Sequence, residues 1–160
     1  MKPPALEYSV ENCTVGRAMA ILGERWTFVV LREIFNGVRR FEDMRRHTDI
    51  PRQVLANRLT TLVEQGILRR EPYREPGERL RHEYRLTEKG FDLYPVLVAV
   101  WEWGDRYLAD PDGSPVTVAH RDCGGTVGVQ LVCSEGHVLK SPREAATRPG
   151  PGARPFRERA

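Results

Sequence analysis

The feature that most constrains this chain of 160 residues is a change of apolar period at Gly66. Before that glycine, leucines recur three or four positions apart from Leu55 to Leu62, which is the spacing of one face of an α-helix. After it, apolar and charged side chains alternate from Ile67 to Leu86 and are interrupted at Pro76-Gly77, as in a β-hairpin. The sequence therefore predicts a helix with one buried face that runs directly into a charged hairpin.

Further helical segments lie on both sides of this pair. Apolar residues at helical spacing predict helices from Cys13 to Gly23 and from Trp26 to Asn36, then a short one from Phe41 to Thr48. After the hairpin, Thr87 is a typical N-cap for a long helix, which Pro95 is expected to kink or split. Helix, helix, short helix, helix and hairpin form the element order of a winged helix-turn-helix. We therefore expect an α+β, mainly α fold of this kind, with long C-terminal dimerisation helices and a small β-rich appendage.

Changes of composition divide the chain into four expected parts. The residues before Cys13 lack periodicity, and those from Ser141 on are rich in Pro, Gly and Arg, which is typical of disorder. Between them, residues 116–118 and 126–132 are expected to form short strands. The expected parts are an N-terminal arm (1–12), a winged helix-turn-helix domain (13–108), a hairpin or ribbon-like appendage (109–140) and a disordered tail (141–160).

Composition excludes several other classes of protein. The formal charge is only +3, and the longest apolar run, from Pro95 to Trp101, is far shorter than the roughly 20 residues that span a bilayer. The N-terminus has neither the basic nor the apolar region of an export signal, and the three cysteines are too few for a disulfide framework. We expect a cytoplasmic protein that does not use a membrane.

The helix that begins at Pro51 is the candidate for reading DNA bases. Its leucines are expected to be buried, which leaves polar donors on the other faces: Arg52 can offer a fork to guanine, and Gln53 or Asn57 can pair with adenine. Arginines at the tip of the hairpin can reach phosphate or the adjoining minor groove, and 22 of the 25 basic residues are arginine. The expected contacts to double-stranded DNA are Arg52, Gln53, Asn57, Arg58, Thr60, Arg74, Arg79 and Arg81.

Two alternatives accompany this interpretation. Each of these charged residues could simply be a solvated surface group, and a GC-rich coding bias would also give an excess of arginine; the ordered set is what favours DNA. Arg58 lies at the edge of the leucine stripe, so we expect it to pair with protein or phosphate rather than with a base.

Several stretches between Cys13 and Leu108 resemble the HxlR family, a branch of the MarR-like winged-helix transcriptional regulators. They are Cys13 itself, LGERWTFVVLREIFNGVRRFEDM, VLANRLTTLVEQGIL, HEYRLTEKG and WEWGDRYL. The resemblance implies a homodimeric, cytoplasmic repressor or activator that binds a palindromic operator, with the terminal helices of two subunits forming the dimer interface. The hairpin here, with EPGERLRH, is longer than the common form of the family.

The aromatic content of the last long helix also favours a homodimer. Such a helix exposes more aromatic area than a domain of this size readily covers, although the same side chains could close the core of a monomer. A two-fold dimer would present two recognition helices about 34 Å apart, which matches successive major-groove faces. The expected interface residues are Tyr94, Leu97, Trp101 and Tyr107.

Cys13 is a candidate redox sensor. It lies at the start of a helix, where unpaired N–H groups favour a thiolate. In the family that the chain resembles, some members use a cysteine at this position to sense oxidants or electrophiles. The alternative is a small buried residue that packs under the dimer helices.

The C-terminal appendage contains a candidate zinc site. His120 and Cys123 are followed by Cys133 and His137, a spacing that could supply four tetrahedral ligands. Gly136 stands where a ribbon would carry its second cysteine, so a hairpin without metal is the alternative, and no other cofactor is expected. Four protein ligands would leave no open coordination position, so the cluster does not indicate an enzyme.

A small-molecule effector is a further possibility. The residues that could line its pocket are Trp26, Phe28, Tyr94, Trp101 and Trp103, although aromatic residues on helices more often belong to the core. The leading prediction is therefore a DNA-binding transcriptional regulator that responds to an oxidant, an electrophile or a small ligand. The alternatives are a winged-helix module that binds protein and a zinc-dependent sensor.

Overall fold

The computed structural model describes residues 9–155, which divide into two compact units. One unit is Glu24–Val129, and the other combines the two described ends of the chain, up to Gly23 and from Gln130. Most of the predicted arm (1–12) and the last five residues of the predicted tail (141–160) lie outside the described residues. The four parts expected from composition stay a prediction.

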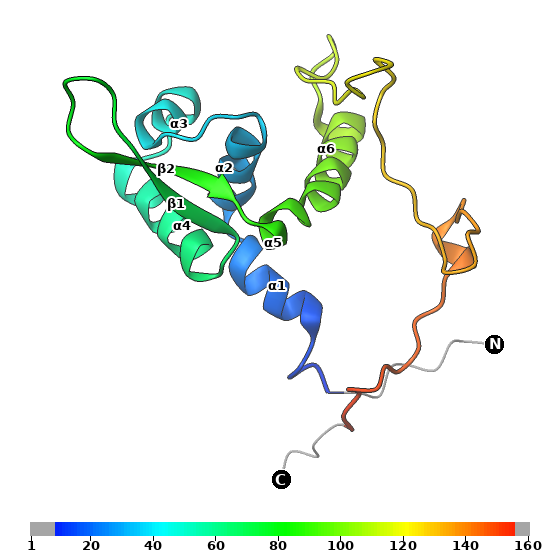
Figure 1. The fold of residues 1–160 in the computed structure, drawn as a ribbon. Helices are drawn as coiled ribbons and strands as arrows, with labels where there is room; N and C mark the ends of the chain where they lie inside the picture. Colours follow the sequence, from blue (N-terminus) through cyan, green and yellow to red (C-terminus); the bar gives the residue numbers. More distant parts are fainter. Residues whose placement is uncertain (1–8, 156–160) are drawn as a thin grey trace. The chain divides into compact units, whose positions relative to one another are not determined.

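The larger unit has the element order of a winged helix-turn-helix (Figure 1). Its elements are α2 (Arg25–Phe35), α3 (Phe41–Thr48), α4 (Arg52–Glu64), β1 (Leu68–Tyr73), β2 (Arg81–Leu86), α5 (Glu88–Phe91) and α6 (Tyr94–Leu108). The two strands pair antiparallel, from Leu68 opposite Leu86 to Tyr73 opposite Arg81. We call this hairpin with its loop, residues 68–86, the wing. The predicted α+β, mainly α winged helix-turn-helix fold is confirmed.

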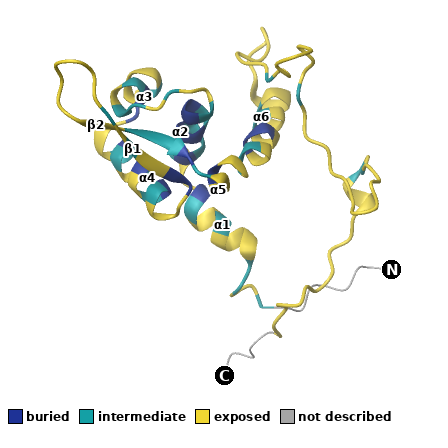
Figure 2. Ribbon diagram, viewed as in Figure 1, coloured by how far each residue is buried: buried dark blue, intermediate teal, exposed yellow. Residues whose placement is uncertain are grey.

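The core of this unit lies between α2, α4 and the base of the wing. Leu31 of α2 and Leu55 and Leu59 of α4 are fully buried, and Leu68 at the base of the wing is 2% exposed. Figure 2 shows the buried residues on α2, α4 and the base of the wing, whereas the loop of the wing is exposed. Burial of one such leucine stabilises the fold by about 1.5–3 kcal/mol. These leucines therefore fix which face of α4 points away from the protein.

A buried carboxylate joins α2 to α3. Glu33 is 6% exposed, and its Oε1 accepts hydrogen bonds from Nε and Nη2 of Arg32 at 3.1 and 2.7 Å. The Nδ1 atom of His47, on α3, lies 3.1 Å from the other carboxylate oxygen. A buried charge is tolerated when it is paired and hydrogen-bonded in this way. The pair with His47 therefore helps to hold α3 on the core.

Thr87 closes the junction between α4, the wing and α5. Its Oγ1 donates to the carbonyl oxygens of Gly66 and Ile67 at 2.5 and 3.1 Å, and it accepts from the N–H of Gly90 at 3.1 Å. Gly66 has a φ of +68°, a conformation that favours glycine. The predicted N-cap at Thr87 is therefore confirmed.

The expected long C-terminal helix is split, as Pro95 suggested. α5 ends at Phe91, and α6 begins at Tyr94 with the proline in its first turn. A proline is tolerated there because the N–H that it lacks would have no partner within the helix.

The expected short strands of the appendage are not continuous. Ala119 and Thr126 form an isolated bridge in the larger unit, and Val132 and Val138 form another in the smaller unit. Most side chains around both bridges are exposed, so an extended ladder there would have little apolar face to bury. The smaller unit also contains α1 (Thr14–Leu22) and a short 3₁₀ helix, η1 (Pro142–Glu144).

Candidate nucleic-acid interface

The turn between α3 and α4 sets the direction of the candidate recognition helix. Asp49 ends α3 in the left-handed conformation, with a φ of 56°, and its N–H donates to the carbonyl of Arg45 at 2.9 Å. Ile50 is 1% exposed, so it anchors the turn in the core. Pro51 then occupies the N-cap of α4 in an extended conformation. A sharp turn between two helices, held by one buried apolar residue, is the geometry of a helix-turn-helix.

The solvent-facing side of α4 carries four of the five polar residues that the sequence assigned to DNA. Arg52, Gln53, Asn57 and Thr60 are exposed, whereas Leu55 and its neighbours in the leucine stripe are buried. The first two lie in the first turn of the helix, which is the end that contacts base edges when such a helix enters a major groove.

Three of these side chains have partners within the protein. The Nη2 atom of Arg52 forms an ion pair with Oε1 of Glu42, and its guanidinium lies over the ring of Phe41 at 5.2 Å. The side-chain amide of Gln53 donates to Oδ1 of Asn57 at 2.9 Å. Glu42 was missed by sequence reasoning, because it is ten residues from its partner and the turn brings the two together. Three of the four groups that the sequence assigned to DNA therefore have partners within the protein.

Arg58 lies apart from this exposed set. Its side chain is 20% exposed, and its Nε atom lies 3.8 Å from Oε2 of Glu24, an ion pair without hydrogen-bond geometry. The prediction that Arg58 pairs with protein or phosphate agrees with this position, since a protein carboxylate already faces it.

The loop of the wing presents the other predicted arginines. Arg74, Arg79 and Arg81 are all exposed, and only Arg81 has an ion pair among the described residues, to Glu78 at 3.1 Å. Two guanidinium groups at the tip are therefore available for phosphate.

Arg40, at the start of α3, contacts the loop of the wing. Arg40 forms an ion pair with Glu75 at 2.6 Å, and its guanidinium lies 4.2 Å from the centre of the Tyr73 ring. The hydrogen bond that Arg40 donates to Glu75 raises the pKa of Arg40. No pattern in the sequence predicts this contact.

The base of the wing is also charged. Glu71 forms ion pairs with Arg69 at 2.7 Å and with Arg85 at 2.8 Å. The hydrogen bond from Arg69, together with the charges of Arg85 and Arg39, lowers the pKa of the Glu71 carboxyl. The N–H of Tyr84 donates to the carbonyl of Arg39 at 2.8 Å, which attaches the wing to the segment between α2 and α3.

The predicted redox residue caps α1. The thiol sulfur of Cys13 accepts from the N–H of Gly16 at 3.5 Å, and the residue is neither fully buried nor fully exposed. Cys13, Cys123 and Cys133 are all free thiols.

The predicted zinc ligands fall into different units. His120 and Cys123 belong to the larger unit, where the N–H of Cys123 donates to Nδ1 of His120 at 3.4 Å. Cys133 and His137 belong to the smaller unit, with Sγ and Nδ1 separated by 3.5 Å. Among residues 9–155 no three His, Cys, Asp or Glu side chains are grouped as metal ligands. The zinc site therefore gains no geometric support.

The predicted interface residues of α6 serve different purposes. Leu97 is 4% exposed in its own chain, and Tyr94 packs on Phe35 with ring centres 4.8 Å apart. Trp101 is half-buried, whereas Tyr107 is 62% exposed. Leu97 thus belongs to the core of the chain itself. The exposed apolar side chains of α6 are instead Val96, Val100, Trp103, Tyr107 and Leu108.

The residues predicted for an effector pocket are also dispersed. Phe28 and Trp101 line a cavity of about 190 Å³ between α2 and α6. Trp26 lies under the guanidinium of Arg25 at 4.5 Å, and Trp103 is 59% exposed.

Among residues 9–155, no helix combines the length and the apolar character that crossing a membrane requires.

Comparisons with known proteins agree with this geometry. The HxlR-like helix-turn-helix family matches residues 21–112. An HTH-type transcriptional regulator of Mycobacterium tuberculosis is 44% identical over 147 residues, which cover 92% of either chain. The HTH-type transcriptional regulator YdeP of Bacillus subtilis is 32% identical over 98 residues, which cover 61% of this chain and 75% of YdeP.

Solved structures give the same result. The crystal structure of PA1607, a candidate transcription factor, superimposes with a TM-score of 0.76 at 33% identity and covers 86% of this chain and 95% of PA1607. The oxidised form of the redox regulator HypR has a TM-score of 0.54 at 27% identity, over 61% of this chain and all of HypR. Because the family match spans more than half of the chain, the chain belongs to the HxlR family of helix-turn-helix transcriptional regulators, which are DNA-binding proteins and not enzymes.

Proposed function

We propose that the chain is a cytoplasmic, homodimeric repressor that binds a palindromic operator. In this proposal α4 enters the major groove, and the wing contacts the neighbouring backbone or minor groove. The observation that carries it is the exposed polar face at the N-terminal end of α4, above a fully buried leucine stripe and beside a wing tip with Arg74 and Arg79 free of ion pairs among the described residues. Long polar donors in this position are what direct readout requires.

The roles of the individual residues follow from their positions. Arg52, Gln53 and Asn57 contact bases, and Thr60, farther along α4, contacts the DNA backbone. Arg74, Arg79 and Arg81 bind phosphate and so supply affinity without sequence preference. Arg58 supports α4 through Glu24.

The dimer rests on the exposed apolar face of α6. Val100 and Trp103 are 48% and 59% exposed, and Trp103 packs on Tyr107 with ring centres 5.4 Å apart. A contiguous exposed apolar surface of this kind is typical of a protein interface. We therefore assign the two-fold contact to the predicted Tyr107 together with Val96, Val100, Trp103 and Leu108, in place of the predicted Tyr94, Leu97 and Trp101. Sedimentation of Trp103→Glu tests it, and a dimer as stable as the wild type would rule this face out.

Selection of bound DNA from a random library tests the operator. A two-fold symmetric motif is expected, with half-sites about one helical turn apart, and log affinity is expected to fall steeply with log salt. The double variant with Arg52→Ala and Gln53→Ala is expected to lose discrimination among selected sequences. Gln65→Ala, at the other end of α4, is the matched control and is expected to bind as the wild type does. A winged-helix module that binds protein would yield no enriched motif.

Cys13 is proposed as an oxidant or electrophile sensor, supported by its position at the start of α1 and by the fold shared with HypR, which is described as a redox regulator. Operator affinity is expected to change after mild oxidation of the wild type and to stay constant in Cys13→Ser. An equal response of both proteins would remove this role. A reporter gene placed behind the selected operator tests the sign of regulation, and repression is expected.

A further inference from the structure

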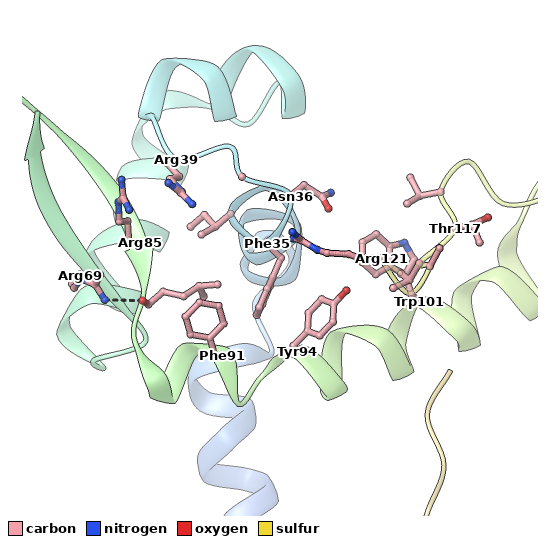
Figure 3. Close-up of a pocket in the computed structure, with 16 residues that line it drawn as sticks. Phe35, Asn36, Arg39, Arg69, Arg85, Phe91, Tyr94, Trp101, Thr117 and Arg121 are labelled. Atoms are coloured by element: carbon pink, nitrogen blue, oxygen red, sulfur yellow. Dashed lines mark hydrogen bonds between the residues drawn. The ribbon is translucent and has the colours of Figure 1, made fainter. Parts of the chain in front are cut away.

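The larger unit contains a cavity of about 630 Å³ that the DNA-binding proposal does not use (Figure 3). Its walls come from the end of α2, the base of the wing, the region of α5 and the start of α6, and residues 116–121. The last of these segments lies beyond the region that matches the HxlR-like family, residues 21–112. The size is in the range of cavities that hold a small organic molecule.

One part of the cavity wall is aromatic. The ring of Phe35 lies 4.8 Å from that of Tyr94 at an angle of 43°, and 6.4 Å from that of Phe91 at 69°. Phe91 is nevertheless 59% exposed, and Trp101 also lines the cavity. Figure 3 shows Phe35, Phe91 and Tyr94 near one another, with Trp101 farther along α6. An exposed phenylalanine beside two further rings offers a flat surface on which another ring can stack.

The charged part of the wall carries only one sign. Arg39, Arg69, Arg85 and Arg121 line the cavity, and no aspartate or glutamate is among its lining residues. Arg69 and Arg85 share Glu71, which lies outside the lining.

The other two arginines remain uncompensated. Within residues 9–155 neither Arg39 nor Arg121 forms an ion pair. The pKa of Glu71 is lowered by Arg69 first and also by Arg85 and Arg39, in agreement with an excess of positive charge at this end.

We infer that this cavity binds an organic anion with a planar aromatic body, of the aromatic carboxylate class. The carboxylate would take the forked hydrogen bonds that a guanidinium offers, from Arg39 or Arg121, and the ring would stack among Phe35, Phe91 and Tyr94. A neutral molecule of the same shape would leave both arginines unpaired and would bind more weakly.

Such a ligand acts on the wing. Arg69, in the cavity wall, donates from Nη1 to the carbonyl of Leu86 at 2.9 Å, and Arg85 belongs to the same strand pair. A bound anion competes with Glu71 for these guanidinium groups and so changes the position of the wing. This regulatory step rests on the proposed DNA-binding function, whereas binding of the ligand does not.

Calorimetric titration of the full chain with 2-naphthoate tests the binding site, with 2-naphthamide as the neutral ligand of matched shape. We expect 2-naphthoate to bind one per chain with a dissociation constant below about 1 mM, and at least about tenfold more tightly than 2-naphthamide. Arg39→Gln and Arg121→Gln are each expected to weaken 2-naphthoate binding by about three- to tenfold at low salt. Arg70→Gln, an exposed arginine of β1 that does not line the cavity, is the control and is expected to bind as the wild type does.

Equal affinity for the two naphthalene compounds, or no binding of either, would overturn the inference. Unchanged affinity in both Arg39→Gln and Arg121→Gln would overturn the assignment of the site. The effect of 2-naphthoate on operator affinity is then measured with the selected DNA, where a shift in the wild type and a smaller shift in Arg121→Gln at the same 2-naphthoate concentration are expected. If the unliganded protein bound none of the selected DNA, the proposed function would be contradicted. The calorimetric titration would still show whether the cavity binds 2-naphthoate.

Discussion

Replacement of Gly90 by alanine tests how the junction between α4, the wing and α5 is packed. A Cβ at this position would lie 2.3 Å from the carbonyl oxygen of Ile67 and 2.9 Å from Cδ2 of Leu86. The leucine side chain can move, but the carbonyl accepts hydrogen bonds from N–H and Oγ1 of Thr87, both at 3.1 Å. Relief of the overlap therefore requires the cap at Thr87 to open.

The magnitude follows from these contacts. Overpacking costs about 1–3 kcal/mol, and loss of the cap and of one backbone hydrogen bond costs about 1 kcal/mol each. Alanine regains about 1 kcal/mol through its helix propensity. We expect Gly90→Ala to lower the free energy of unfolding by about 2–4 kcal/mol, and the melting temperature by on the order of 10–20 °C.

Thermal and urea unfolding followed by circular dichroism measure this loss, with Gly104→Ala as the matched control. Gly104 lies within α6, and a Cβ there meets no atom within 4 Å, so that variant is expected to be as stable as the wild type or up to about 1 kcal/mol more stable. If the two variants melted together, the close approach of Gly90 to Ile67 would be refuted.

Three further predictions concern the core, the cap and the base of the wing. Leu59→Ala, at a fully buried position, is expected to lower the free energy of unfolding by about 2–5 kcal/mol in urea titration; a loss below about 1 kcal/mol would contradict its burial. Thr87→Ala is expected to cost about 1 kcal/mol and Thr87→Ser much less, and equal melting of the two variants would show that the hydroxyl does not cap α5. Because the folded-state pKa of Glu71 is lowered, its ion pairs stabilise the wing above the unfolded-state pKa, and this contribution disappears as the pH falls through the folded-state pKa. Glu71→Gln is therefore expected to weaken the pH dependence of the melting temperature on the acid side, and an unchanged profile would contradict the ion pairs.

The helices and the wing were predictable because each depends on a regular spacing of apolar residues or on a capping residue, glycine or proline close by in the sequence. The leucine stripe of α4, the cap at Thr87 and the split at Pro95 are all fixed by residues within a few positions of one another. The strands expected at 116–118 and 126–132 failed for the complementary reason. Alternation there was not accompanied by a buried face, and the segment forms only isolated bridges.

The candidate site was predictable in composition but not in its internal contacts. Exposure of Arg52 and Gln53 follows from the stripe, whereas the pair between Arg52 and Glu42 depends on the turn between α3 and α4. Apolar period also cannot tell a residue of the chain's own core from a residue of an interface, and Leu97, which was predicted for the interface, is 4% exposed within the chain. The cavity requires residues 116–121 to lie beside the base of the wing, and nothing in that segment's sequence indicates where it goes.

In the proposed complex with DNA, the ion pair between Arg52 and Glu42 affects how strongly different operator sequences are distinguished. The Glu42 carboxylate competes with DNA for the Arg52 guanidinium. DNA therefore binds this guanidinium only if it offers a better hydrogen-bond acceptor than the carboxylate. A guanine in the right position meets that condition and an ill-matched sequence does not. The ion pair thereby lowers the affinity for every DNA sequence and increases the ratio of the affinity for the correct operator to that for other sequences. Glu42→Gln is expected to lower this ratio and to raise the affinity for correct and incorrect sequences alike.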